Sequence, residues 1–190
     1  MKVILGLGNP GRRYERTRHN VGWWMLDHLA DVWHFGRWKE ERNALTAGGR
    51  LGAAHVRLIK PLTFMNLSGE VLVEYLRRPA WSAATDLLVV VDDVAIPVGT
   101  WRLRAEGSSG GHNGLKSVEG QVGSRAYARL RVGIKPAEEM GRIPLEDFVL
   151  APFAATEREA VLGTREAVSK AVERWVHGGV AAALKSHSHE

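Results

Sequence analysis

A glycine-rich segment near the N-terminus, together with the histidine that follows it, could carry out acid–base chemistry. The segment reads Gly-Leu-Gly-Asn-Pro-Gly over residues 6–11, and His19 follows at the head of an expected helix. An imidazole can accept a proton from water near neutral pH, and a carboxylate partner fixes its tautomer. Asp92 and Asp93 end an expected buried strand, where a carboxylate could reach His19. A turn or a helix cap is the alternative role for these two acids.

Three asparagines supply the other groups that such chemistry needs. Water that attacks an acyl carbon produces an oxyanion, which neutral amides and backbone N–H groups can stabilise without adding a base. Asn9, Asn66 and Asn113 lie in loops at expected strand ends or helix starts, although ordinary turn hydrogen bonding is the alternative for each. The sequence has no histidine–glutamate zinc motif and no cysteine. Water activated by a histidine is therefore the most economical chemistry.

The spacing of Gly6, Gly8 and Gly11 also matches the dinucleotide-binding fingerprint, which would indicate an oxidoreductase. That fingerprint requires a helix that begins inside the glycine loop and an acid about 20 residues later, at the end of a second strand. A proline and a glycine interrupt such a start, and the acids at the required distance, Asp27 and Asp31, fall inside the expected helix. The glycines are then expected to let the backbone turn sharply after the strand.

Strands and helices alternate along the chain and must position these residues. Apolar or alternating runs predict strands at residues 2–7, 54–60, 86–91, 99–104 and 127–134. Amphipathic or capped segments predict helices at 20–33, at 66–77 behind Asn66 and Ser68, from about 115, and from Thr156, capped with Glu159, to about 178. Such alternation predicts an α/β fold in which helices cover a mixed or mostly parallel sheet.

The chain length of 190 residues fits one domain, which we expect over residues 1–184, followed by a disordered tail over 185–190. No apolar run approaches the roughly 18 residues of a membrane span. The first residues have no signal-peptide layout. With no cysteine in the chain, we expect a cytoplasmic protein.

Positive charge is concentrated in two segments, although the net charge of the chain is only +5. Residues 10–18 carry four arginines against one glutamate, and residues 99–135 carry seven basic residues against two acidic ones. This distribution suits a polyanionic partner. A solvated basic surface with no partner is the alternative.

Five segments resemble, in order, the motifs of bacterial peptidyl-tRNA hydrolases, at residues 6–22, 60–69, 91–99, 107–116 and 129–134. The resemblance implies a single-domain, three-layer α/β/α sandwich with a mixed, mostly parallel sheet. It implies a metal-independent esterase, without a cofactor, that cleaves the ester between a peptide or N-blocked aminoacyl group and the tRNA 3′ end. Such an enzyme recycles tRNA from prematurely released peptidyl-tRNA. The expected partner is the tRNA acceptor arm, with no membrane or metal, and we expect a monomer.

The resemblance also assigns roles, residue by residue. His19 resembles the general base, Asp92 the residue that keeps it basic, and Asn9 a position that helps to reject aminoacyl-tRNA with a free amine. The substrate contacts it implies are Asn66 and Asn113 at the peptide and scissile region, Tyr14 and Phe64 near the terminal adenosine, and Arg102, Arg104 and Arg131 at phosphates. Ala95 stands where the family often has an acid, a departure expected to alter local hydrogen bonding.

Two other functions stay open. A non-catalytic RNA-binding relative of the same fold would keep the basic surface, but the intact set of His19, Asp92 and asparagines argues against it. A dinucleotide-binding oxidoreductase depends on the glycine spacing alone.

Overall fold

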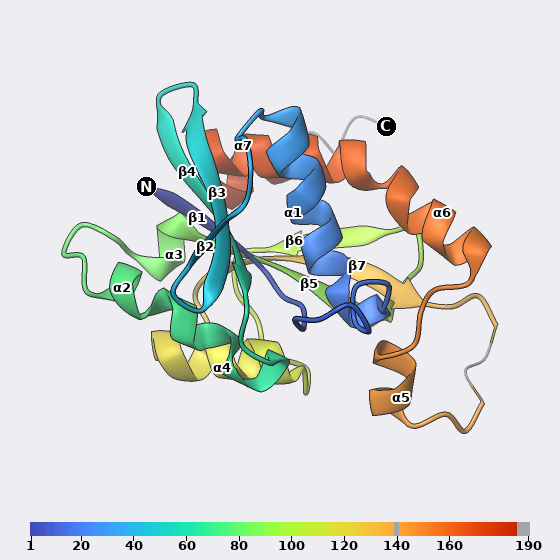
Figure 1. The fold of residues 1–190 in the computed structure, drawn as a ribbon. Coiled ribbons are helices and arrows are strands. Elements are labelled where there is room, and N and C mark those ends of the chain that lie inside the picture. The colour runs from blue at the N-terminus through green and yellow to red at the C-terminus, as the bar shows by residue number, and fades with distance from the viewer. Residues whose placement is uncertain (139–140, 186–190) are drawn as a thin grey trace.

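A seven-stranded sheet of order β2-β3-β4-β1-β5-β7-β6 crosses the computed structural model, which describes residues 1–138 and 141–185 (Figure 1). Its strands are β1 (Lys2–Gly6), β2 (Lys39–Glu41), β3 (Ala44–Leu51), β4 (Ala54–Pro61), β5 (Leu87–Pro97), β6 (Trp101–Arg104) and β7 (Ala128–Lys135). The central strands β4, β1, β5 and β7 are mutually parallel, whereas β2, β3 and β6 join antiparallel at the two edges. The prediction of an α/β fold with a mixed sheet is confirmed.

Helices cover both faces of this sheet (Figure 1). One face packs against α1 (Val21–Val32) and α7 (Arg165–Leu184), the other against η2 (Met65–Leu72), α2 (Val73–Leu76) and α4 (Asn113–Val122). The remaining short elements are η1 (Arg18–Asn20), α3 (Ala83–Asp86), α5 (Leu145–Val149) and α6 (Ala155–Gly163). In the fully buried run 87–91, alternate side chains enter the two cores. The continuous apolar pattern of this strand follows from burial on both faces.

The expected helix over 66–77 forms differently. Residues 65–72 make a 3₁₀ helix, and no side chain caps it; Ser68 Oγ instead donates to the Met65 carbonyl at 2.8 Å. A Cβ atom on Gly69 would lie 2.4 Å from the Ser117 carbonyl oxygen, and the Gly69 N–H donates to Ser117 Oγ. Tertiary packing against α4, rather than local capping, therefore determines this segment.

The C-terminal helix is also different from the expected one. It begins as α6 one residue before Thr156, and Glu157 rather than Glu159 accepts the hydrogen bond of the Ala154 N–H, at 2.9 Å. A second helix, α7, then continues past the predicted end, through a kink at Gly179 with φ of 70°. Residues 186–190 of the expected tail lie outside the described residues. Among the described residues, no helix is both long and apolar enough to cross a membrane.

Candidate active site

Close packing of glycines brings the start of α1 against the ends of β1 and β5. A Cβ on Gly22 would lie 2.5 Å from the Val90 carbonyl oxygen, and one on Gly6 would lie 2.8 Å from the Gly22 oxygen. A Cβ on Gly8 would lie 2.7 Å from the Trp23 ring. Of the three glycines in the opening segment, only Gly11 has a positive φ, 105°. The predicted turn role therefore holds for Gly11, whereas Gly6 and Gly8 permit close helix–strand contact.

Asn20 fixes the loop that carries Asn9. Its Oδ1 accepts from the Asn9 N–H and its Nδ2 donates to the Asn9 carbonyl, both at 2.9 Å. Asn9 Oδ1 in turn accepts from the Met65 N–H at 2.8 Å. Because the carboxamide is planar, this bond directs the Asn9 NH₂ group away from the Met65 N–H. The NH₂ group can therefore donate a hydrogen bond to a ligand. Asn9 and Asn20 are buried, so the whole arrangement is rigid.

His19 and Asp92 meet as the sequence predicts. His19 Nδ1 lies 2.9 and 3.0 Å from the two carboxylate oxygens of Asp92. A carboxylate can only accept, so Nδ1 carries the proton and Nε2 keeps its lone pair. An imidazole in this tautomer can take a proton from a water molecule.

A second histidine shares the same carboxylate. His112 caps α4: its Nδ1 accepts from the N–H groups of Gly114 at 3.1 Å and Leu115 at 3.4 Å. The proton of His112 therefore sits on Nε2, which lies 2.9 Å from Asp92 Oδ1. The two rings are tilted, with centroids 4.8 Å apart. The hydrogen bonds at the start of α4 thus fix the tautomer of His112, and Asp92 fixes the tautomer of His19.

Asp92 is 3% exposed, and its environment favours the charged form. Burial would by itself raise the pKa of the carboxyl, but the charges and hydrogen bonds of His19 and His112 outweigh burial and hold that pKa well below its usual range. Asp92 is therefore ionised throughout the neutral pH range.

The three side chains are also of the types that bind divalent metals, and their ligand atoms lie within 4.8 Å of one another. A metal requires unprotonated nitrogens, whereas His19 Nδ1 and His112 Nε2 both donate to Asp92 at hydrogen-bond distance. The observed geometry is that of a complete hydrogen-bond network.

A pocket of about 300 Å³ opens at this network. His19, Asp92, His112 and Asn113 line it together with the loop before α4 and with α5. Asn113 is exposed at the start of α4, and Asn66 is exposed on η2. A Cβ on Gly114 would lie 2.6 Å from Met65 Sδ, so glycine at this position lets the two asparagine-bearing helices approach.

The half-buried Tyr14 and the exposed Phe64 form an aromatic pair that is not part of the pocket lining. Their ring centroids are 6.4 Å apart in an edge-to-face arrangement, and Phe64 is 54% exposed. The guanidinium of Arg13 lies 4.5 Å from the centre of the Tyr14 ring. Exposed rings beside a cation suit the stacking of a base.

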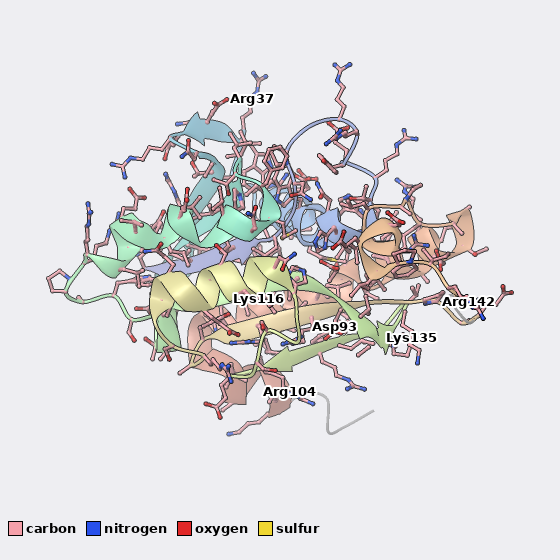
Figure 2. The ribbon with its side chains drawn as sticks, turned by 90° about the horizontal axis from the view of Figure 1, so that it is seen from below. Arg37, Asp93, Arg104, Lys116, Lys135 and Arg142 are labelled. Carbon is pink, nitrogen blue, oxygen red and sulfur yellow. The ribbon has the colours of Figure 1, made fainter. Side chains whose placement is uncertain are left out.

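The three predicted phosphate-binding arginines differ in their surroundings. Arg102 and Arg104 are exposed on β6, and Arg102 lies directly opposite Arg131 in the β6–β7 ladder. Arg131 is bound to Asp93 Oδ2 at 3.0 Å and to the Ser108 carbonyl at 2.6 Å. Figure 2 looks onto this side of the molecule, with Arg104, Asp93 and Lys116 in view. Arg131 therefore links the end of β5 to the glycine loop before α4.

Ala95 does not disturb the strand end. Its backbone N–H donates to Asp93 Oδ1 at 2.8 Å, a bond that needs no side chain. With alanine at this position, both carboxylate oxygens of Asp93 still accept hydrogen bonds, one from the Ala95 N–H and one from Arg131.

Arg18 ties the segment that carries His19 to α5 and α6. It is 8% exposed; Nη2 donates to Glu157 Oε2 at 2.9 Å, and Nη1 donates to the carbonyls of Phe148 and Ala151 at 3.4 Å. The guanidinium also lies 4.3 Å from the centre of the Phe148 ring. One buried cation therefore connects the segment that carries His19 to α5, which lines the pocket.

Replacing Arg18 with methionine is expected to lower the free energy of unfolding by about 3 kcal/mol, because Glu157 loses its partner in a partly buried place. Urea denaturation should show a lower midpoint with an unchanged slope. Lys170→Ala, which removes an exposed pair with Glu166, should cost less than ~0.5 kcal/mol. Equal losses in the two variants would contradict the role given to Arg18.

Sequence reasoning missed two residues of the site. His112 lies in the polar loop before an expected helix, among residues suited to chemistry, but the sequence gives it no role, and Asn20 is only the start of an expected helix. A histidine directly before a helix is a possible cap, which was the available signal for His112. The bridge from Asn20 to Asn9 spans 11 residues and has no local pattern.

Comparisons of the sequence and of the structure with known proteins all find similarity to the same family. A sequence model of the family described as peptidyl-tRNA hydrolase matches residues 3–190. The chain is 53% identical over 187 residues to the peptidyl-tRNA hydrolase of Gemmatimonas aurantiaca, with 98% of each chain covered. It is 43% identical to that of Brevibacillus brevis over 91% of this chain and 88% of the relative. The crystal structure of peptidyl-tRNA hydrolase from Acinetobacter baumannii superimposes with a TM-score of 0.86 at 30% identity, covering 97% and 93% of the two chains.

Proposed function

The chain belongs to the peptidyl-tRNA hydrolase family, and on that premise we propose that His19 is the general base that directs water against the ester of peptidyl-tRNA. The reaction frees a peptide and a tRNA from one another by hydrolysis of that ester. The observation that carries the assignment is the hydrogen-bond network of His19, Asp92 and His112 at the floor of an open pocket.

His19 Nε2 takes a proton from water as the water oxygen bonds to the ester carbonyl carbon. Asp92 stabilises the imidazolium that forms, and His112 holds Asp92 in place. The side-chain amides of Asn66 and Asn113 bind the peptide and the developing oxyanion. When the tetrahedral intermediate collapses, the imidazolium returns its proton to the departing 3′ oxygen of the ribose. The products are a tRNA with a free 3′ hydroxyl and a peptide carboxylic acid, which then loses its proton to solvent and becomes a carboxylate.

Asn9 distinguishes blocked from free substrates. Its oxygen is occupied by the Met65 N–H, so the side chain offers an N–H donor. An acylated substrate has a carbonyl oxygen that can accept this bond. The ammonium group of a free aminoacyl ester is a donor only and leaves Asn9 unsatisfied.

Charge and stacking hold the nucleic acid. Arg102 and Arg104 contact phosphates of the acceptor arm, Arg131 lies at the border between that surface and the pocket, and Tyr14 with Phe64 stacks the terminal adenosine. Phosphate contacts give affinity without reading sequence, which suits a substrate class of many tRNAs. We further propose a cytoplasmic monomer that uses no metal.

Hydrolysis of N-acetyl-aminoacyl-tRNA and of the same aminoacyl-tRNA with a free amine, measured in EDTA, tests this assignment. We expect rapid cleavage of the blocked ester only. Asn9→Ala should reduce the preference for the blocked ester about tenfold, the equivalent of one lost hydrogen bond. Asn43→Ala, which removes an exposed carboxamide that has no hydrogen bond to the described segments around Asn9 and Met65, is the control for a general effect of losing an asparagine. Activity that EDTA abolishes, or an unchanged preference in the Asn9 variant, would count against the proposal.

A further inference from the structure

The residues that line the catalytic pocket carry both signs of charge. Arg131 is one of them and lies in the sheet beside the exposed arginines of β6. Another part of the lining is α5, which contributes Leu145, Glu146 and Val149.

Glu146 is the unpaired carboxylate of this pocket. Asp92 is engaged by two histidines and Asp93 by Arg131. The exposed Glu146 side chain has no hydrogen bond or ion pair within residues 1–138 and 141–185. Arg142, the cation nearest to Glu146 in the sequence, lies at the edge of the molecule in Figure 2 and forms no ion pair with Glu146 among the described residues.

The α5 wall must face the peptide rather than the tRNA. A phosphate chain beside an unpaired carboxylate would be repelled, and the arginines that could bind phosphate belong to β6 and β7 rather than to α5. Leu145 and Val149 are one helical turn apart and share a face, so they offer apolar surface beside Glu146. An aliphatic stem that ends in a cation is complementary to such a surface. Lysine and arginine side chains have this form.

We propose that Glu146 is a specificity-determining residue that favours peptidyl-tRNAs whose esterified residue is lysine or arginine. The esterified residue is the one whose side chain lies beside the carbonyl at His19, and therefore the one that reaches α5 within the same pocket. This inference rests on the proposal that the pocket is the catalytic site.

The test compares two esters carried by one tRNA sequence, Nα-acetyl-lysyl and Nα,Nε-diacetyl-lysyl, which share a stem and differ in charge. We expect kcat/KM to be about threefold to fivefold higher for the charged ester at low salt, the range for a partly exposed ion pair. The ratio should fall toward one in high salt.

Variants of Glu146 decide whether this residue causes the preference. Glu146→Gln should bring the ratio to about one, and Glu146→Lys should reverse it. Asp147→Asn, which removes the same charge from a neighbouring position that does not line the pocket, should leave both the ratio and the rate on the diacetylated ester unchanged. A ratio of one in the unmodified protein, or an unchanged ratio in Glu146→Gln, would overturn the inference. The ratio of the two kcat/KM values does not depend on whether His19 is the base. A failure of this inference can therefore be told apart from a failure of the catalytic assignment.

Discussion

Replacing His19 with alanine is expected to lower kcat for an N-blocked aminoacyl-tRNA about 1000-fold, within the range for loss of a general base. In the proposed mechanism, the change removes the nitrogen that accepts the proton of water, whereas the arginines of β6 and the Tyr14–Phe64 pair are untouched. The dissociation constant for tRNA should therefore change less than about twofold, since phosphate contacts dominate affinity. Single-turnover hydrolysis with enzyme in excess measures the chemical step apart from binding.

His177→Ala is the matched control, because His177 is an exposed histidine of α7 outside the catalytic pocket. This variant should retain the full rate. If His19→Ala hydrolysed the ester at the rate of the control, water activation would have to be assigned to another group. Weakened tRNA binding together with an unchanged single-turnover rate would instead make His19 a binding residue.

The central elements of the fold could be predicted because their patterns are set by burial. The run 87–91 is continuously apolar since both of its faces are covered, and α1 has an apolar stripe that faces the sheet. The hairpin of β2 and β3 could not be predicted in this way. Residues 44–51 read Ala-Leu-Thr-Ala-Gly-Gly-Arg-Leu, with small residues that give weak alternation. This hairpin forms because β3 pairs with β4 along the whole length of both strands.

For the site, the sequence predicts which residues could act and which strand ends carry them, but not every contact between them. His19 and Asp92 were expected to meet because polar residues at the carboxyl ends of parallel strands gather at one edge of the sheet. The shared use of Asp92 by His112 could not be read from the sequence, because it depends on how α4 is docked. The packing of α4 against η2 depends in turn on Gly69 and Gly114, whose role is visible only when a Cβ is placed there. Such close approaches have no periodic pattern.

Replacing Asp92 with asparagine is expected to lower kcat on the order of 10⁴-fold, although the shape of the side chain is kept. His112 Nδ1 must accept from the Gly114 N–H, so His112 Nε2 remains a donor. It will keep the carboxamide oxygen at the position of Oδ1, which places the NH₂ group at the position of Oδ2, 3.0 Å from His19 Nδ1. Although the oxygen at Oδ1 also lies 2.9 Å from Nδ1, a proton on Nδ1 would then oppose the N–H donors of the carboxamide. We therefore expect His19 to move its proton to Nε2. The base then has no lone pair for water.

Because His112 enforces the wrong tautomer in this variant, its removal should partly restore activity. In the double variant Asp92→Asn with His112→Ala, the carboxamide can turn and present its oxygen to His19 Nδ1. We expect the double variant to be about tenfold faster than Asp92→Asn alone, even though His112→Ala by itself should slow the unmodified enzyme. Nitrogen chemical shifts of His19 should report the change of tautomer directly. A double variant slower than Asp92→Asn would show that the negative charge of Asp92, rather than the tautomer it selects, determines the rate.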